Sequence, residues 1–497
     1  MRSILITSYI LIIGFIVYGI SAIFGYLNTG ADRSSMLHTE INKTVHYTPN
    51  LIWNVNSNEG RPIDATNLEA IENDYLDAWY VVHVANKTNT TEGLEDYYTE
   101  SARKPITELI KFNLSQHIHI ESTTLEHHPK LEFFSEDGQL AVLTDHNVVE
   151  YQRIFKENQL INEVRELSTY KIILLLEDGF WRIRHKTKIE SKMLDYSTHS
   201  VTLPKDRLVG INYYPKDSPW DMFGDKFSEV ILSKDFELLH NAGINTLRIF
   251  VQYDDFGGAH VSSDKIDKLK KTLDIAEQFD LKVMVTLFDF YGNYEVLDWT
   301  LNMKHAEQIV KALKAHNALL GWDIKNEPNL DFKNRGRSNV LSWLENMINH
   351  VKFLDPKHPV TIGWSNIESA KLLKNKVDLV TFHYYDALSD LEMKLNSLKD
   401  EVQDKPILLG EFGMSSYSGF WKPFGNSDDE QANYHKTAQE LIKVHNLHAM
   451  SWTLYDFDSI PKEVVGSLPW RKSIQKHFGF IDNEGNPKLA FPYIATE

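Results

Sequence analysis

The sequence predicts an α/β protein in which a (β/α)8 barrel follows a smaller α+β domain and an N-terminal transmembrane helix. Three observations predict this fold class. The chain begins with an apolar run without charges, residues 61–195 combine helical patterns with long alternating strands, and residues 205–497 alternate short strands with helices. The 497 residues are enough for a barrel of about 250 residues and a second domain.

Composition excludes several kinds of partner and site. Hydrophobic residues make up 42% of the chain and charged residues 24%, which is typical of globular proteins. The net charge is −17, from 52 basic and 69 acidic residues, so we expect no nucleic-acid partner. The chain contains no cysteine, which excludes disulfides and thiolate zinc sites.

The apolar run at the N-terminus, residues 4–27, exceeds the roughly 20 residues that a helix needs to span a bilayer. The positively charged Arg2 precedes the run, and the opposite charges of Asp32 and Arg33 cancel after it. The chain that follows is therefore expected outside the cytoplasm, in the periplasm or at the cell surface. A cleavable signal peptide has a shorter apolar core, and Ser21-Ala22 is only a faint cleavage site. We predict an uncleaved signal anchor over residues 1–27.

Two kinds of chain follow the anchor. Residues 28–60 are polar and without periodicity, which predicts a stalk. In residues 61–195, two helical patterns precede long alternating strands, with Asp137-Gly138 and Asp178-Gly179 as hairpin turns. This order predicts an α+β domain whose curved sheet wraps on helices.

The outline of residues 64–190, above all "LLLEDGFWRIRH", resembles the cone-shaped nuclear-transport-factor-two-like superfamily. Such cones sometimes hold a pocket, and His127 and His128 are candidates to line one. A paired His in a strand is more often packed on one face and solvated on the other. The resemblance therefore favours a spacer, a binding module or a docking site for a protein partner that the sequence does not identify.

The pattern lapses between residues 191 and 207, where we place the domain boundary. Eight short apolar strands then follow, at residues 208–214, 245–250, 282–288, 319–326, 359–364, 377–384, 406–412 and 449–457. Helical patterns separate most of them, as a (β/α)8 barrel requires. An open doubly wound sheet would carry a Gly-rich phosphate turn after its first strand, and "GINYYP" is not one.

Two glutamates stand at predicted strand ends, where barrel enzymes place their active sites. Glu327 lies in "NEP" after the fourth strand, and Glu411 lies in "GEFG" on the seventh. One such Glu is usually a solvated terminus. Two carboxylates across a barrel mouth are the arrangement that hydrolyses glycosides, with retention of configuration if they lie about 5 Å apart.

These two motifs resemble the acid/base and nucleophile motifs of clan A glycoside hydrolases and are most similar to the cellulase-like family 5. The resemblance covers about residues 205–490 and implies that Glu327 is the acid/base and Glu411 the nucleophile. It also implies a supporting set that binds the sugar or the nucleophile: Asn326 for the sugar 2-hydroxyl, Arg248 and Tyr385 near the nucleophile, His383 beside that tyrosine, and Trp452 as the stacking platform.

One position departs from the family pattern. Many family 5 enzymes keep a His at the end of strand three, where "TLFDFYGN" offers Asp289. Asp289 is the candidate to take over that hydroxyl contact, and the departure favours an unusual subfamily or a neighbouring clan A family. Loop aromatics are candidates to stack further sugars, namely Trp299, Tyr417, Trp421 and Trp470.

The sequence thus predicts a membrane-anchored, retaining β-glycoside hydrolase that acts on a poly- or oligosaccharide by double displacement. Two alternatives stay open: a transglycosylase that remodels an exported polysaccharide, and a catalytically dead, glycan-binding scaffold. An aldolase-like barrel would need a Schiff-base lysine, for which Lys325 is the only candidate and is expected to point away from the barrel interior. No cofactor and no metal are expected, because two carboxylates suffice. The glycan, its linkage and endo or exo action stay open.

Overall fold

The computed structural model describes residues 13, 14, 18, 47–194, 201, 203 and 206–495. Nearly all of the predicted signal anchor therefore lies outside the described residues. Within the described part of the chain, no helix is both long and apolar enough to cross a membrane. The chain divides into two compact units, which we call the α+β unit (Glu40–Thr198 with Tyr294–Lys304) and the barrel unit (His199–Asn293 with His305–Glu497).

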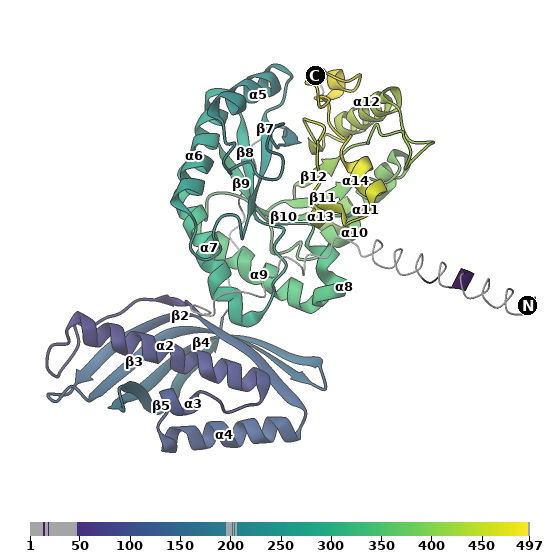
Figure 1. Ribbon diagram of the computed structural model, residues 1–497. Helices are drawn as coiled ribbons and strands as arrows, with labels where there is room; N and C mark the ends of the chain where they lie inside the picture. The colour runs from purple at the N-terminus through teal and green to yellow at the C-terminus, as the bar shows by residue number, and fades with distance from the viewer. Residues whose placement is uncertain are drawn as a thin grey trace, which may run out of the picture. The chain divides into compact units, whose positions relative to one another are not determined.

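The α+β unit is built on a five-stranded sheet in the order β1-β2-β3-β4-β5 (Figure 1). The short β1 runs parallel to β2, and the other pairs are antiparallel. Glycines in the left-handed region close the two predicted hairpins, with φ of 71° at Gly138 and 88° at Gly179. The strands are β1 (Asn50–Leu51), β2 (Ile118–Phe134), β3 (Leu140–Lys156), β4 (Gln159–Glu177) and β5 (Phe180–Met193).

Helices pack on one face of this sheet: α2 (Ala65–Thr88), α3 (Leu94–Tyr97) and α4 (Glu100–Ser115). Asp64 caps α2 by accepting a hydrogen bond from the Asn67 backbone N–H at 2.9 Å. From α2, Ile71, Tyr75 and Trp79 enter the core that the helices share with the strands. This amphipathic spacing explains why the helix forms here.

Two boundaries in this unit differ from the prediction. The stalk expected over residues 28–60 is wrong near its end, because β1 pairs with β2 and so belongs to the sheet. The second of the two predicted helical patterns forms two helices, α3 and α4, separated at Tyr98 and Thr99, where the Thr99 backbone N–H donates to the Ile183 carbonyl of β5 at 3.1 Å.

The α+β unit is discontinuous in sequence, because it includes Tyr294–Lys304 from within the later part of the chain. In this segment, Glu295 pairs with Lys87 of α2. Thr300 accepts a hydrogen bond from the Thr48 backbone N–H at 3.0 Å. The buried ring of Trp299 packs on Tyr151 of β3, with centroids 4.3 Å apart.

The barrel unit confirms the predicted (β/α)8 fold. Eight parallel strands close in chain order, with β13 pairing with β6. The strands are β6 (Val209–Asn212), β7 (Thr246–Gln252), β8 (Lys282–Asp289), β9 (Leu319–Asn326), β10 (Val360–Trp364), β11 (Val380–Tyr384), β12 (Ile407–Phe412) and β13 (His448–Ser451). An apolar layer near their N-terminal ends fills one end of the barrel, from Leu208, Met284, Leu320, Leu379, Leu408 and Met450. Polar side chains lie at the opposite end of the barrel, which is formed by the C-terminal ends of the strands.

Helices surround the barrel strands (Figure 1). The longer ones are α5 (Glu229–Asn241), α6 (Ser263–Gln278), α7 (Trp299–Leu313), α9 (Arg337–Leu354), α11 (Leu391–Val402) and α12 (Asp428–Val444). Short helices interrupt the loops: η2 (Val296–Asp298), η3 (Pro328–Asp331), α8 (Phe332–Arg335), α10 (Ile367–Ala370), η4 (Leu388–Asp390), α13 (Lys462–Val465), α14 (Pro469–Gln475) and η5 (Phe491–Tyr493).

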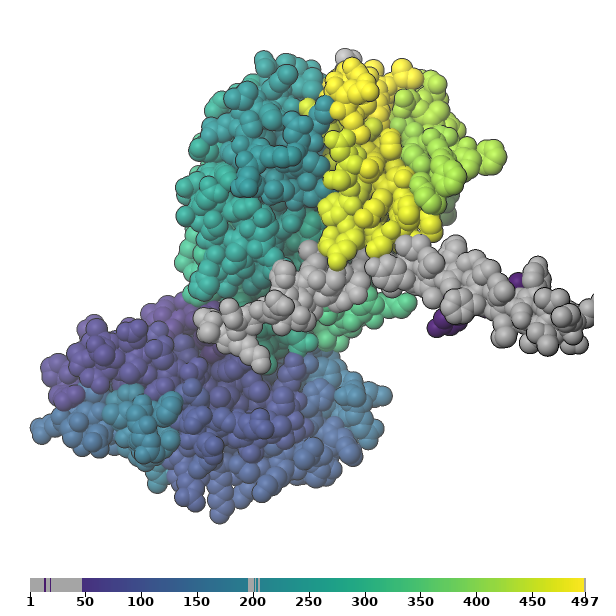
Figure 2. All heavy atoms as spheres, viewed as in Figure 1, coloured from purple at the N-terminus to yellow at the C-terminus, as the bar shows by residue number. Residues whose placement is uncertain are grey.

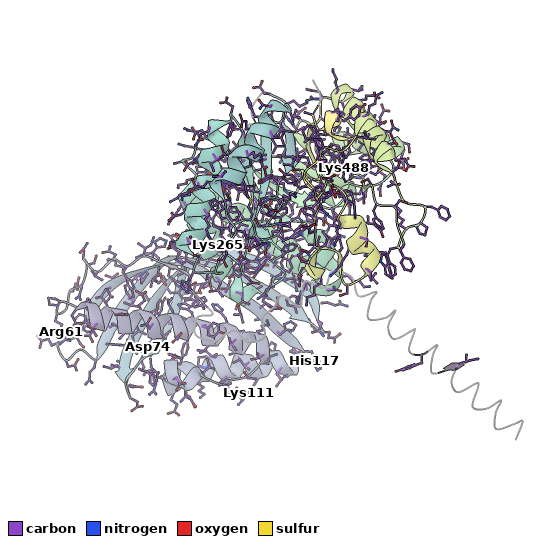
Figure 3. The ribbon with its side chains drawn as sticks, turned by 45° about the horizontal axis from the view of Figure 1, so that its top comes forward. Arg61, Asp74, Lys111, His117, Lys265 and Lys488 are labelled. Carbon is purple, nitrogen blue, oxygen red and sulfur yellow. The ribbon has the colours of Figure 1, made fainter. Side chains whose placement is uncertain are left out.

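The last strand is shorter than predicted, since β13 ends at Ser451 and not near residue 457. Beyond it, Asp456 accepts a hydrogen bond from the Gly479 backbone N–H at 2.8 Å and pairs with Lys488 at 2.7 Å (Lys488 is labelled in Figure 3). These contacts hold the C-terminal segment against the barrel unit, where Figure 2 shows it in yellow beside the teal and green chain. The chain after β13 is therefore a structured loop.

Candidate active site

A pocket of about 250 Å³ opens where the barrel strands end at their C-terminal side. Both predicted glutamates reach it. Its lining combines carboxylates, an amide and several aromatic rings: Tyr214, Trp220, Phe250, Asp289, Phe290, Asn326, Glu327, Tyr385, Glu411, Trp452, Val464, Val465, Gln475 and Phe478.

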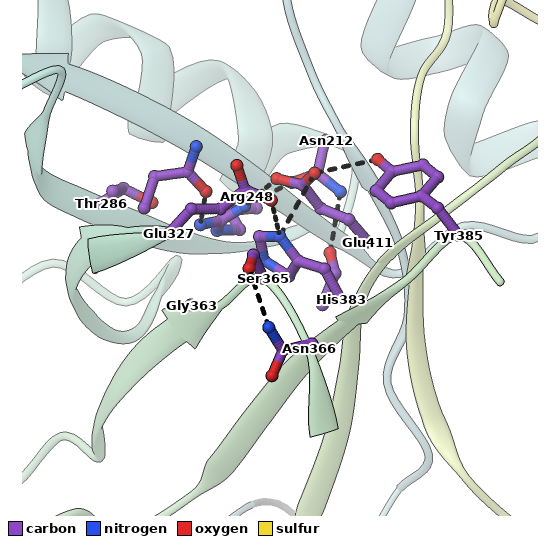
Figure 4. A network of polar contacts seen from close by, with 12 residues as sticks. Asn212, Arg248, Thr286, Glu327, Gly363, Ser365, Asn366, His383, Tyr385 and Glu411 are labelled. Atoms are coloured by element: carbon purple, nitrogen blue, oxygen red, sulfur yellow. Dashed lines mark hydrogen bonds and ion pairs between the residues drawn. The ribbon is translucent and has the colours of Figure 1, made fainter. Parts of the chain in front are cut away.

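Arg248 of β7 lies beneath this pocket, at the centre of a network of hydrogen bonds (Figure 4). Its guanidinium is fully buried and donates to Asp323 Oδ2 through Nε at 3.1 Å and Nη2 at 2.6 Å. Nη1 donates to Glu411 Oε1 at 2.7 Å and to Asn212 Oδ1 at 2.9 Å. Nη2 also donates to Asn326 Oδ1 at 2.9 Å. Burial alone would lower the pKa of Arg248, but the carboxylates of Asp323 and Glu411 raise it above its ordinary value.

Glu411 of β12 accepts hydrogen bonds on both oxygens. Arg248 binds Oε1, and the Tyr385 hydroxyl donates to Oε2 at 3.0 Å. Burial, and then the charges of Glu411 and Glu327, raise the pKa of Tyr385, so the phenol stays protonated and remains a donor. A cation and a neutral donor thus hold the two oxygens of Glu411 in place, as a carboxylate nucleophile requires.

Glu327 follows β9 in a left-handed backbone conformation, with φ of 48° and ψ of 47°. This conformation costs a non-glycine residue about 1–2 kcal/mol, and such strain is typical of functional sites. Its backbone N–H donates to the Gly363 carbonyl at 2.6 Å, and Pro328 then begins η3. The turn places Glu327 Oε1 at 3.0 Å from Nδ1 of His383, a buried residue of β11.

The two glutamates lie close together. One ligand oxygen from each, together with His383 Nδ1, falls within a mutual distance of 4.8 Å. Such a set has the donors to hold a metal ion. However, Glu411 already has a positive partner, because the Arg248 guanidinium lies 2.7 Å from its Oε1. The arrangement suits a pair of carboxyl groups, one of which exchanges protons.

Aromatic rings form the side walls of the pocket. Trp452 follows β13, and its ring lies near those of Tyr214, Trp220 and Phe250. The Phe250 ring stacks on the Tyr214 ring, with centroids 5.1 Å apart. Asp289, at the end of β8, accepts a hydrogen bond from the Tyr214 hydroxyl at 3.4 Å. Burial, and then the Asp289 charge, raise the pKa of Tyr214. An apolar wall with a few fixed polar groups suits a sugar ring, which has both C–H faces and hydroxyl edges.

The structure brings together the eight residues predicted as the catalytic pair and its supporting set. Six of them line the pocket: Asn326, Glu327, Asp289, Tyr385, Glu411 and Trp452. Arg248 and His383 lie beneath it, in contact with the glutamates. Lys325 does not line the pocket; its side chain is buried, with Nζ 3.6 Å from Asp331. Trp299 was a candidate to stack sugars, and this is wrong, because its ring is buried in the α+β unit.

Sequence reasoning missed two groups of residues. The first is Asp323, which lies in the middle of β9 and accepts hydrogen bonds from Arg248. A carboxylate inside the buried strand "GWDIKN" was a usable signal for this residue. The second group comes from loops beyond the strand ends, where no periodicity points to a pocket: Trp220, Phe290, Val464, Val465, Gln475 and Phe478.

Comparison with known proteins gives a family match for the barrel. Residues 215–458 match the model of the cellulase family, glycosyl hydrolase family 5. The β-glucuronidase of Rattus norvegicus is 24% identical over 320 residues, covering 59% of this chain and 45% of that protein. The human β-glucuronidase is 23% identical over 283 residues, covering 52% and 40%. The chain thus spans less than half the length of these curated relatives.

Two solved structures show a partial likeness to this chain. An exo-β-1,4-mannosidase from Opitutaceae bacterium strain TAV5 has a TM-score of 0.49 and 18% identity, covering 58% of each chain. A β-D-glucuronidase from Dictyoglomus thermophilum has a TM-score of 0.43 and 19% identity, covering 72% of this chain and 67% of that one. The family match over residues 215–458, on a barrel with the two glutamates at its strand ends, supports a glycosidase.

Proposed function

We propose that the protein is a retaining β-glycosidase that hydrolyses a poly- or oligosaccharide by double displacement, with Glu327 as acid/base and Glu411 as nucleophile. The observation that carries this proposal is the short separation of the two carboxyl groups, whose oxygens approach within 4.8 Å. Retaining enzymes hold their carboxyl groups about 5–5.5 Å apart, whereas inverting enzymes leave about 6.5–9.5 Å for a water molecule.

In the first step, Glu411 Oε2 or Oε1 attacks the anomeric carbon while Glu327 gives its proton to the glycosidic oxygen. The carbon–oxygen bond breaks, the leaving group departs as an alcohol, and a glycosyl ester forms on Glu411. In the second step, the Glu327 carboxylate takes a proton from water, and the resulting hydroxide displaces Glu411 from the anomeric carbon. Asn326 accepts from Arg248 through its oxygen, so its NH₂ group is the part that can donate to a sugar hydroxyl.

The pocket favours a neutral sugar. Its described lining includes three carboxyl groups, from Asp289, Glu327 and Glu411, and no Lys, Arg or His. The nearest cation, Arg248, is already bound to two carboxylates. A uronic acid would bring a further negative charge without a partner, so we propose a neutral β-glycoside in spite of the match to β-glucuronidases. The volume of about 250 Å³ is below the usual range of ligand pockets and encloses about one ring, which favours a terminal sugar residue.

The cellular location of the protein is part of the same proposal. The uncharged run over residues 4–27 supports a signal anchor, with the two units outside the cytoplasm. Work on a glycan at the cell surface suits such an anchor, and transfer to a sugar acceptor stays an alternative because it uses the same glycosyl-enzyme. A dead scaffold is disfavoured, because Glu411 keeps its hydrogen bonds from Arg248 and Tyr385, and Glu327 keeps its contact with His383.

The two glutamates can be told apart by replacing each with alanine and adding azide. In Glu411→Ala, hydrolysis of aryl β-glycosides should stop, and azide should restore turnover with a product of inverted configuration. In Glu327→Ala, substrates with good leaving groups should still form the glycosyl-enzyme, because they need no proton. Azide should then speed release with net retention.

The exposed Glu440→Ala on α12 is the control, and it should behave as the wild type. Equal responses of the two variants to leaving group and to azide would contradict the assigned roles. A wild-type enzyme that inverts the configuration would contradict double displacement itself.

A further inference from the structure

Two exposed phenylalanine rings stand at the tips of two consecutive turns in the loop between β12 and α12. Backbone hydrogen bonds join Gly419 and Lys422 in both directions, at 3.2 and 2.9 Å, and close a two-residue turn with Phe420 at its tip. The Gly425 backbone N–H donates to the Lys422 carbonyl at 3.0 Å and closes the next turn, which carries Phe424. Phe420 is 84% exposed and Phe424 is 97% exposed. Closed turns therefore hold both rings out in water, where Figure 2 shows the light-green chain projecting from the barrel unit.

Two tryptophans extend this apolar surface. The Trp421 ring meets Phe420 edge to face, with centroids 4.9 Å apart, and lies 6.1 Å from the Trp470 ring of α14. We call Phe420, Trp421, Phe424 and Trp470 the aromatic tip. None of its rings lines the catalytic pocket or the neighbouring pocket of about 610 Å³, so their position does not support the sugar stacking for which Trp421 and Trp470 were candidates. A cluster of exposed rings outside both pockets marks an interaction surface.

Four basic side chains accompany the aromatic tip. Lys422 lies within the loop, Arg471 and Lys472 lie on α14, and Lys476 follows α14. All four are at least partly exposed, and none of them pairs with a carboxylate in the part of the chain that the structure describes. The acidic residues 428–430 begin α12, where the helix N-terminus offsets part of their charge. In a chain with a net charge of −17, these cations make a local surface that suits an anionic partner.

The order of the groups on this surface matches the layers of a lipid bilayer. At such an interface, apolar rings enter the boundary of the acyl chains, tryptophan lies at the level of the headgroups, and lysine and arginine reach anionic headgroups. Here the two phenylalanines are the most exposed rings, and Trp421 behind them is 45% exposed. The cations of α14 lie beside Trp470 in the sequence. Rings and charges therefore point to the same partner.

We propose that the aromatic tip, with Lys422, Arg471, Lys472 and Lys476, binds the surface of an anionic phospholipid bilayer. The uncharged run over residues 4–27 predicts a tether to a membrane, and this contact is a second, separate one on the barrel unit. Helix α14 also carries Gln475, which lines the catalytic pocket, so the contact holds that pocket close to the lipid. The contact does not depend on the glycosidase chemistry.

The test uses a local probe, because the chain contains no cysteine and single cysteines can be labelled. Phe424→Cys carries a nitrobenzoxadiazole fluorophore at the aromatic tip. Glu440→Cys, at an exposed position of α12, carries the same fluorophore as the matched control. The full chain is combined with phosphatidylcholine–phosphatidylglycerol vesicles whose acyl chains carry or lack bromine, a short-range quencher. The probe reports only its own surroundings, so a membrane tether elsewhere in the chain does not produce the signal.

The label at residue 424 should lose about half or more of its fluorescence in brominated anionic vesicles, because interfacial rings lie about 5–10 Å into the bilayer. The label at residue 440 should keep its fluorescence. Vesicles of phosphatidylcholine alone, the charge reversal Arg471→Glu with Lys472→Glu, and the ring removal Phe420→Ser should each reduce quenching at residue 424 by about twofold or more. The matched reversal at exposed helical positions, Arg337→Glu with Lys436→Glu, should leave it unchanged.

Several outcomes would overturn the proposal. Equal quenching at residues 424 and 440, or no quenching at residue 424, would show that the aromatic tip does not meet lipid. Quenching that is as strong with phosphatidylcholine alone, or that survives the reversal at Arg471 and Lys472, would remove the anionic surface as the partner. Quenching that survives Phe420→Ser would show that the rings do not carry the contact. A label at residue 424 that responds to soluble polygalacturonate and not to vesicles would assign the surface to an acidic glycan instead.

Discussion

Replacing Arg248 with lysine should destabilise the barrel unit strongly, because lysine cannot reproduce the guanidinium's contacts. Arg248 donates five hydrogen bonds to four side chains, two of them carboxylates. A lysine ammonium has three donors on one nitrogen, so at least two of the five are lost. Each hydrogen bond to a charged group contributes about 1.5–3 kcal/mol, and leaving a buried carboxylate unpaired costs about 3–5 kcal/mol. We expect the free energy of unfolding to fall by about 3–5 kcal/mol.

Urea denaturation of the full chain, followed by intrinsic fluorescence, measures this loss. Arg337→Lys is the control, because Arg337 is exposed at the start of α9 and should change stability by less than about 0.5 kcal/mol. The same Arg248→Lys variant should also lose kcat/KM, since Glu411 loses a buried partner. A fall in stability below about 1 kcal/mol would show that the guanidinium network does not hold the site together.

Three further predictions follow from the structure. Initial rates should show kcat/KM for a neutral aryl β-glycoside at least about tenfold above that for the aryl β-glucuronide, and a preferred glucuronide would contradict the charge argument. Burial, and then Lys488, lower the pKa of His435 from 6.5 to about 3, so only the unfolded chain takes up a proton between these values and stability falls as the pH drops below 6.5. The difference in unfolding free energy between His435→Phe and the wild type should therefore be about 2 kcal/mol larger, in favour of the variant, at about pH 5 than at about pH 8. An equal difference at both pH values would refute this. The intact protein should sediment with membranes and need detergent for release, whereas a soluble mature chain beginning near Ile23 would indicate a cleaved signal.

The residues that the sequence reveals are those whose place follows from strand periodicity. Glu327 and Glu411 stand at strand ends, and the closed barrel brings all such ends to one mouth. Asp323 was harder to recognise, because the pairing of β9 with β10 shifts register between Thr361 and Gly363, and simple alternation no longer tells which side chains face inward.

The rest of the site depends on loops and long-range packing. Trp220 and Phe478 reach the catalytic pocket from segments far apart in the sequence, and no local pattern indicates that they meet. In the α+β unit, the hairpins at Gly138 and Gly179 were predictable, because each turn needs a residue with positive φ. The strand β1 was not, because two residues carry no periodic signal and gain their structure only by pairing with β2.

The discontinuity of the α+β unit limits how this protein can be engineered or exchanged during evolution. A gene cut near codon 200 would leave the α+β unit incomplete, since Tyr294–Lys304 would remain with the barrel half. An isolated barrel would then carry Trp299 without Tyr151, the ring that it packs on within the α+β unit. The α+β unit therefore cannot be exchanged for another domain by replacing residues 40–198 alone. The segment that follows β8 must be redesigned as well.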